Sequence, residues 1–228
     1  MHVLGHRGSR IPGPENTPEA VRGALAAGAL GSEIDVRRSA DGDLVCVHDP
    51  VAGPDGLAVI EQSTAALAAA GIPTLAEVVA AAGGGRLVIE VKNLPGEPDY
   101  TRDALAAQLL VAELGRLDAE ADILISSFDP AAVDVARAAG WRTGLLTIPG
   151  VLTQEGLAYV LERGYTELHA HVSTIREGSA RLVHDAGLSL VGWTVTTLSE
   201  VGPLRDLGVD VVICDDPAGA VRLLADDA

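Results

Sequence analysis

Acidic and basic side chains alternate with aliphatic ones in two short apolar segments of this chain. One segment contains Glu33 and Asp35, and the other contains Glu90 and Lys92, the only lysine among the 16 lysines and arginines. Residues two apart in a strand point to the same side, so each pair projects from one face. Ionised groups on a buried strand are costly unless they have partners. Three carboxylates and one ammonium group facing inward therefore predict a site that binds a metal and an anion.

The donor set favours a hard divalent cation. Three carboxylates without a nearby cysteine suit Mg²⁺ or Ca²⁺ better than Zn²⁺. We therefore expect Glu33, Asp35 and Glu90 to bind Ca²⁺ or Mg²⁺. Because such a site stays negatively charged, an anionic substrate needs further cations. Arg7 and Lys92 are the candidates, since an arginine fork suits two phosphate oxygens.

Two histidines complete the candidate catalytic residues. His6 and His48 follow apolar segments, and they can serve as general acid and general base because the pKa of histidine lies near neutrality. A metal, a cationic phosphate clamp and two proton carriers together indicate phosphoryl transfer at a phosphodiester. The sequence leaves open which histidine is the acid. It also leaves open whether water or a substrate hydroxyl attacks phosphorus.

The segments that must position these residues follow a repeated pattern. Short apolar runs typical of strands alternate with amphipathic stretches of helical length. The expected strands are 3–6, 32–36, 87–92, 122–126, 143–147, 166–169, 189–195 and 209–214. Eight such units in 228 residues predict an α/β fold, a TIM (β/α)8 barrel forming one domain over residues 1–228, since about 250 residues are typical. An open doubly wound sheet is the alternative, although no glycine fingerprint for it is present.

Local signals refine this barrel. An extra strand is expected at 44–48, after a tight hairpin turn at Asp41-Gly42-Asp43, so that residues 49–71 form a short excursion following the second barrel strand. Capping patterns predict helices that begin after Thr17, Thr74, Thr174 and Thr197. Catalytic residues of a TIM barrel lie where its strands end. The candidate acids, lysine and histidines all occupy such positions, and their occurrence in three successive units favours a shared site.

Composition limits the partners. A formal charge of −16 argues against nucleic acid and anionic membrane surfaces, because both attract basic patches. No apolar run reaches the roughly 18 residues of a membrane span, and no leader precedes the first strand, so we expect a cytoplasmic protein acting on a small molecule. Cys46 and Cys214 lie far apart in apolar segments and are expected to be buried free thiols. The oligomeric state stays open.

Motifs along nearly the whole chain resemble those of glycerophosphodiester phosphodiesterases. The matching residues are His6-Arg7-Gly8, Pro14-Glu15-Asn16-Thr17, Glu33-x-Asp35, His48-Asp49, Glu90-x-Lys92, Ser127-Phe128, Trp193-Thr194-Val195, Gly208-x-Asp210 and Asp215-x-Pro217. The resemblance implies a TIM barrel that depends on Ca²⁺ or Mg²⁺. It also implies cleavage of a glycerophosphodiester to glycerol 3-phosphate and an alcohol.

The same resemblance implies roles for individual residues. The three acids would bind the metal, His6 and His48 would exchange protons, and Arg7 and Lys92 would hold the phosphate. Further substrate-binding positions are Glu15, Asn16, Phe128, His171 and Trp193. The chain departs from the family pattern in three places. These are the short 50–60 segment, Thr196 where asparagine is frequent, and Cys214 where threonine is usual.

Other functions are compatible with parts of the sequence. A sphingomyelinase D-like enzyme or a phospholipase would need an apolar or basic rim for membrane lipid, which a chain at −16 with 3% aromatic residues offers poorly. His169-Ala170-His171 places two imidazoles on one strand face, which is compatible with a Zn²⁺ site of an amidohydrolase or with pocket-lining residues. A catalytically inactive barrel used for binding is the non-enzyme alternative.

Overall fold

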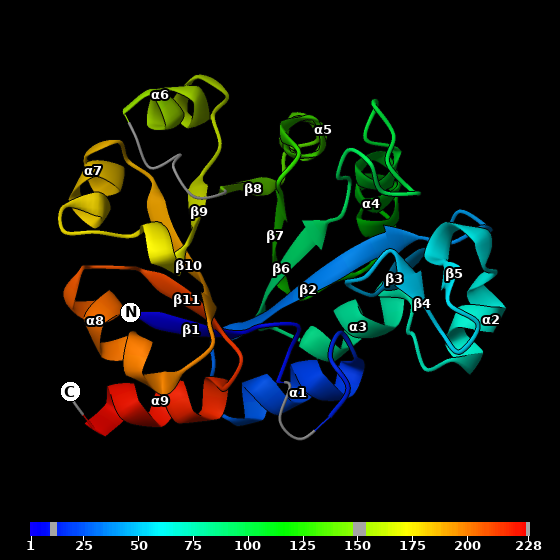
Figure 1. Ribbon diagram of the computed structural model, residues 1–228, viewed down its shortest axis with the longest axis horizontal. Helices are drawn as coiled ribbons and strands as arrows, with labels where there is room; N and C mark the ends of the chain where they lie inside the picture. The colour runs from blue at the N-terminus through cyan, green and yellow to red at the C-terminus, as the bar shows by residue number, and fades with distance from the viewer. Residues whose placement is uncertain (10–12, 148–153, 227–228) are drawn as a thin grey trace.

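The computed structural model describes residues 1–9, 13–147 and 154–226. Within them, eight parallel strands close into a barrel surrounded by helices (Figure 1). In order around the barrel they are β1 (His2–Gly5), β2 (Gly31–Arg38), β6 (Arg86–Val91), β7 (Asp122–Ser127), β8 (Arg142–Thr147), β9 (Glu167–His171), β10 (Ser189–Val195) and β11 (Val211–Cys214). Strand β1 pairs with both β2 and β11, which closes the sheet and excludes the open doubly wound alternative. The predicted TIM barrel is therefore confirmed.

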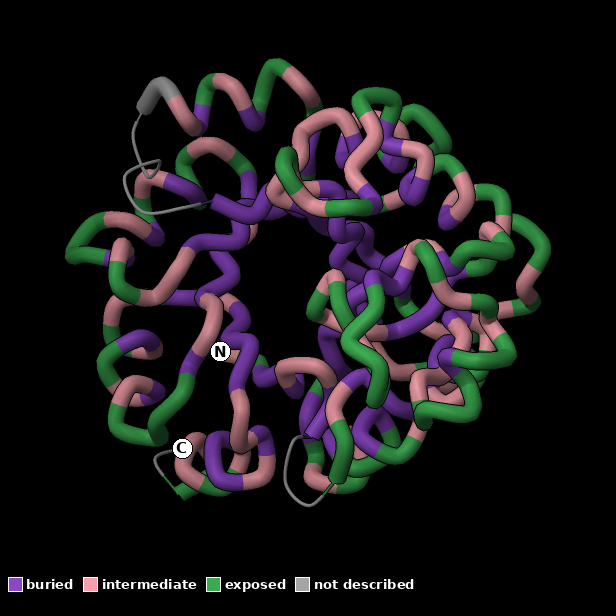
Figure 2. The backbone as a smooth tube through the Cα atoms, turned by 45° about the vertical axis from the view of Figure 1, so that its right-hand side comes forward, coloured by how far each residue is buried: buried purple, intermediate pink, exposed green. Residues whose placement is uncertain are grey.

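Helices follow the strands and cover the outside of the barrel. They are α1 (Pro18–Ala26), α3 (Leu75–Ala82), α4 (Leu105–Leu114), α5 (Pro130–Ala138), α6 (Gln154–Glu162), α7 (Ser179–Asp185), α8 (Val201–Asp206) and α9 (Pro217–Asp226). Figure 2 shows the strands as a buried inner ring and the outer helices with exposed outward faces. None of these described helices combines the length and the apolar character needed to cross a bilayer.

The alternation of side chains along each strand separates two apolar regions. Outward residues such as Leu87 and Ile89 of β6 pack under the helices. Inward residues such as Leu4, Val88 and Leu124 form a separate cluster inside the barrel. Because successive strand residues point to opposite sides, Glu90 faces the same way as Val88. Apolar side chains thus fill the middle of the barrel interior. The three acids lie toward the ends of the strands, and a second charged pair, Arg86 and Glu167, lies at the start of β6 and β9.

A hairpin and a short excursion follow β2, as expected. Strand β3 (Leu44–Cys46) runs antiparallel to β2, and Gly42 takes the left-handed φ of 87° that the turn requires. The strand is shorter than the predicted 44–48, because Val47 and His48 leave the sheet and the His48 carbonyl accepts a hydrogen bond from Arg37 Nε at 2.8 Å. The excursion contains β4 (Val51–Ala52), β5 (Leu57–Ala58), η1 (Val59–Glu61) and α2 (Thr64–Ala69).

Three of the four predicted helix starts are correct. Thr17 accepts a hydrogen bond from the Ala20 backbone at α1, and capping boxes begin α3 at Thr74 and the short turn η3 (Leu198–Glu200) at Thr197. The prediction at Thr174 is wrong. Its hydroxyl donates to the His171 carbonyl at 2.7 Å and closes the turn η2 (Val172–Thr174), while α7 begins only at Ser179. The two cysteines are buried and unpaired, as expected.

Candidate active site

Three buried acids converge where β2 and β6 end. Asp35 of β2 lies directly beside Glu90 of β6 in the parallel register, and Glu33 points to the same side as Asp35. One carboxylate oxygen from each residue lies within 4.8 Å of the other two. In the part of the chain that the structure describes, this is the one group of three or more potential metal ligands. Its all-oxygen donor set fits a hard divalent cation.

The charges of this cluster need a cation. Burial raises the pKa of Glu33 well above its usual range, and the neighbouring charges of Asp35 and Glu90 raise it further. Burial also raises the pKa of Glu90 to about 7, although Lys92 opposes this effect. Asp35 differs because Lys92 and Asn16 outweigh its burial and lower its pKa. Lys92 therefore balances the negative charge of Asp35 but does not balance the charges of the two glutamates. A bound divalent ion would neutralise them.

Lys92 and Asn16 fix the orientation of Asp35. Lys92 Nζ lies 2.8 Å from Asp35 Oδ1 and also donates a hydrogen bond to Glu90. Asn16 Nδ2 donates to Asp35 Oδ2 at 2.9 Å, and the Asp35 backbone N–H donates to Asn16 Oδ1 at 2.9 Å. An ammonium group has three donors, so these two acids leave one available to an anion.

Arg7 reaches the acids from the loop after β1. Its backbone takes a left-handed φ of 51°, which directs its N–H to Glu33 Oε2 at 3.0 Å. Its guanidinium donates to Glu15 Oε1 at 2.7 Å and forms an ion pair with Asp35 at 3.3 Å between Nε and Oδ2. The Asn16 N–H donates to the Arg7 carbonyl at 2.8 Å, which holds together the two described parts of the segment between β1 and α1.

Both candidate catalytic histidines pair one ring nitrogen with a carboxylate. His6 Nδ1 lies 2.6 Å from Asp215 Oδ1, and His48 Nδ1 lies 2.6 Å from Asp49 Oδ1. An ionised carboxylate only accepts hydrogen bonds, so Nδ1 carries the proton and Nε2 is left for proton transfer. Burial lowers the pKa of His48, and the charge of Lys92 lowers it further.

Two residues that support these histidines were not predicted. Asp215 belongs to a motif recognised in the sequence, but its pairing with His6 joins residues 209 positions apart. Arg37 is 1% exposed and donates to the His48 carbonyl, to Glu97 and to both oxygens of Asp99. Its place on the same strand face as Glu33 and Asp35 was a signal that could have identified it.

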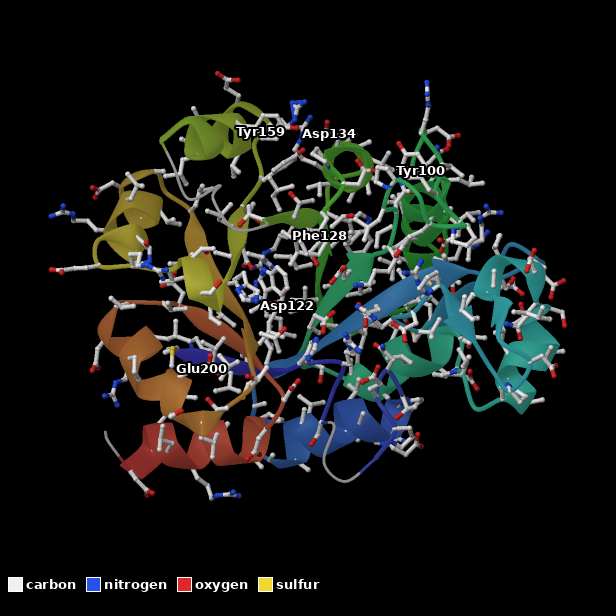
Figure 3. The ribbon with its side chains drawn as sticks, viewed as in Figure 1. Tyr100, Asp122, Phe128, Asp134, Tyr159 and Glu200 are labelled. Atoms are coloured by element: carbon white, nitrogen blue, oxygen red, sulfur yellow. The ribbon has the colours of Figure 1, made fainter. Side chains whose placement is uncertain are left out.

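Three ring side chains gather beside the acids. The Phe128 and Trp193 rings pack edge to face with centroids 5.3 Å apart, and His171 packs against Trp193 in the same way at 5.1 Å. Figure 3 shows Phe128 near the centre of the barrel. The three come from the ends of β7, β9 and β10, so their neighbourhood depends on the closed sheet. The structure thus brings together three of the residues predicted to bind substrate, Phe128, His171 and Trp193.

The histidine pair of β9 does not form a metal site among the described residues. His169 is buried, with Nε2 lying 3.1 Å from Glu167 Oε2. His171 Nδ1 instead contacts the Ser173 hydroxyl at 2.7 Å. Neither belongs to a described group of three potential ligands. This geometry favours the pocket-lining interpretation of His171 over a Zn²⁺ site.

Comparison with known proteins decides the family. The model of the glycerophosphoryl diester phosphodiesterase family matches residues 6–54 and 55–219. The chain belongs to this family. A glycerophosphodiester phosphodiesterase of Caldanaerobacter subterraneus subsp. tengcongensis is 28% identical over 240 residues, which cover 97% of each chain. The chain is thus a phosphoric diester hydrolase, and the predicted resemblance is confirmed.

Solved structures agree with this family assignment. The glycerophosphodiester phosphodiesterase of Thermotoga maritima superimposes with a TM-score of 0.80 at 26% identity, over 98% of both chains. A phosphodiesterase of Oleispira antarctica, solved with its product sn-glycerol-3-phosphate, has the same fold, with a TM-score of 0.84 at 24% identity over 99% of this chain and 97% of that one. The family match favours a glycerophosphodiester substrate over the sphingomyelinase D-like, amidohydrolase and inactive-barrel alternatives.

Proposed function

We propose that this enzyme hydrolyses glycerophosphodiesters to glycerol 3-phosphate and an alcohol, with Ca²⁺ or Mg²⁺ held by Glu33, Asp35 and Glu90. The buried cluster of three carboxylates supports this function most strongly. His6 lines the same small cavity as Glu33 and Glu90, and the charge of His48 acts on Asp35. Both imidazoles therefore belong to the surroundings of the acids.

Different side chains around the acids bind the substrate and transfer protons. When bound, the divalent ion supplies positive charge that stabilises the developing charge on phosphate oxygens. Arg7 and the remaining donor of Lys92 bind the phosphate, and Glu15 and Asn16 hold Arg7 and Asp35 in position. His6 Nε2 and His48 Nε2 then exchange protons with the attacking and leaving oxygens, as general acid–base catalysis requires.

The organic part of the substrate contacts the ring side chains. Phe128, His171 and Trp193 form an aromatic wall next to the acids. The bound product of the Oleispira antarctica phosphodiesterase supports glycerol 3-phosphate as the product here as well. A cytoplasmic location, the single-domain boundaries and the absence of nucleic-acid and membrane partners stay predictions.

A substrate panel tests this function. The purified protein is incubated with glycerophosphodiesters in EDTA, Mg²⁺ or Ca²⁺, and released glycerol 3-phosphate is measured with a coupled dehydrogenase. Sphingomyelin and phospholipid vesicles are included for the two lipid alternatives, and their turnover is followed by the water-soluble head group that they release, because they yield no glycerol 3-phosphate. We expect release from a glycerophosphodiester only with a divalent ion. Turnover in EDTA, or turnover of the vesicles alone, would contradict the proposal.

A further inference from the structure

A groove of about 430 Å³ opens next to the candidate active site. One wall is η2 with Ile175, and the other is η3 and α8 with Pro203, Leu204 and Leu207. We call it the η2–α8 groove. It lies after the ends of β9 and β10, on the face of the barrel where the three acids lie. Figure 3 shows Glu200, which also lines it, on the α8 side of the barrel.

The groove adjoins the small cavity at the acids. Thr194 lines both the groove and a second cavity of about 20 Å³, which is also lined by His6, Glu33 and Glu90. His171 lines the groove as well and packs against Trp193, which borders the small cavity. A phosphodiester whose phosphate sits at the acids therefore has the groove within reach of one of its two substituents.

Its size and lining indicate what it holds. Pockets for small organic ligands span roughly 300–1,000 Å³, which is more than ethanolamine or another small head group fills. Apolar side chains dominate the α8 wall, and Glu200 is the one charged side chain among the described lining residues. Its carboxylate accepts the backbone N–H groups of Thr196 and Thr197 at 3.0 and 2.9 Å. An anionic group would find no cation here.

We propose that the η2–α8 groove binds the leaving alcohol of the phosphodiester and that the preferred alcohols carry an apolar chain and no anionic group. This inference rests on the proposed function, because it names the substrate class of the same site. The glycerol phosphate half binds to the acids, Arg7 and Lys92. The apolar chain of the alcohol packs against Ile175 and Leu204 and is thereby buried.

A homologous series of substrates tests the proposal. Ethyl, butyl and hexyl esters of glycerol 3-phosphate share one glycerol phosphate half, and their alcohols have nearly equal leaving ability. We expect kcat/KM to rise roughly fourfold for each methylene group, the value for full burial of a CH₂ group. Ser199→Trp, at an exposed lining position, should remove this rise while the ethyl ester is still hydrolysed. Ala138→Trp on the exposed face of α5 is the matched control and should keep it.

The experiment distinguishes an error in the groove assignment from an error in the proposed function. A kcat/KM that does not change with chain length, or an unchanged dependence in Ser199→Trp, would overturn the groove assignment while leaving hydrolysis intact. Pro203→Phe on the same wall gives a second block if Ser199→Trp does not fold, as judged by circular dichroism. No glycerol 3-phosphate from any ester, glycerophosphocholine included, would instead overturn the proposed function.

Discussion

Replacing Glu90 by glutamine should stabilise the metal-free protein while it abolishes activity. Burial raises the pKa of Glu90 to about 7, from an ordinary value of 4.5, even though Lys92 donates to it. A raised pKa means that the folded state favours the protonated acid. The favourable contribution of Glu90 to the free energy of unfolding is therefore complete below pH 4.5 and is lost as the pH rises through about 7. The difference between the two pKa values corresponds to about 3 kcal/mol, at about 1.4 kcal/mol for each pKa unit.

Glutamine keeps the shape of Glu90 and cannot ionise. At pH 8 in EDTA, Glu90→Gln should therefore unfold at a temperature about 6–12 °C above that of the wild type, since 1 kcal/mol shifts Tm by about 2–4 °C in a protein of this size. At pH 5 the Tm values of the variant and the wild type should be nearly equal. Thermal unfolding followed by circular dichroism measures both values. Glu162→Gln changes an exposed acid of α6 and serves as the control, with no shift expected at either pH.

Added metal should reverse the order of stability. An ion at one thousand times its Kd stabilises the wild type by about 4.1 kcal/mol, which exceeds the advantage of about 3 kcal/mol of the variant, and the variant that lacks one ligand should gain much less. Turnover of a glycerophosphodiester is measured on the same samples and should be lost. Equal Tm values at pH 8 in EDTA would refute the charge argument. Turnover near that of the wild type would refute the assignment of Glu90 to the metal.

The two histidines, Arg37 and Glu167 can be tested in the same way. His6→Asn and His48→Asn should each remove one limb of a bell-shaped pH profile of kcat/KM, and a variant that keeps both limbs would exclude that histidine from proton transfer. Arg37→Met leaves the buried Asp99 without its partner and should lower the free energy of unfolding by about 3–5 kcal/mol in urea titrations, whereas a loss below about 1 kcal/mol would mean that the ion pair is dispensable. Burial acts to raise the pKa of Glu167, but His169 and Arg86 outweigh it and lower the value to about 2. Glu167 therefore contributes about 3 kcal/mol to the free energy of unfolding above pH 4.5, and this contribution is lost as the pH falls toward 2. In urea titrations, the free energy of unfolding of Glu167→Gln should lie below that of the wild type by an amount that shrinks over this pH range. A difference that does not vary with pH would contradict this assignment.

The strand positions were predictable because a closed parallel barrel buries both faces of its strands. Continuous apolar runs such as Leu87–Ile89 are typical of strands buried in this way, and the charged residues at their ends stand out against them. The position of Glu90 beside Asp35 followed from strand parity and neighbouring order alone. Helix starts were less certain, since Thr174 satisfies a capping pattern but uses its hydroxyl to close a turn with His171.

Contacts between distant segments were not predictable from local patterns. The His6–Asp215 pair forms only because β1 and β11 are neighbours in the closed sheet. Arg37 could be placed on the inner strand face, but its partners Glu97 and Asp99 lie in a loop whose path no periodicity describes. The shape of the η2–α8 groove likewise depends on how two short turns pack.

In the proposed site, the carboxylates of Glu33, Asp35 and Glu90 share one divalent ion. A crystal structure of the wild type grown with Ca²⁺, with anomalous diffraction to locate the ion, shows whether they do. We predict one ion with an oxygen from each of the three acids at about 2.3–2.6 Å. An ion bound elsewhere, with the three acids held only by Lys92, Asn16 and Arg7, would contradict the claim.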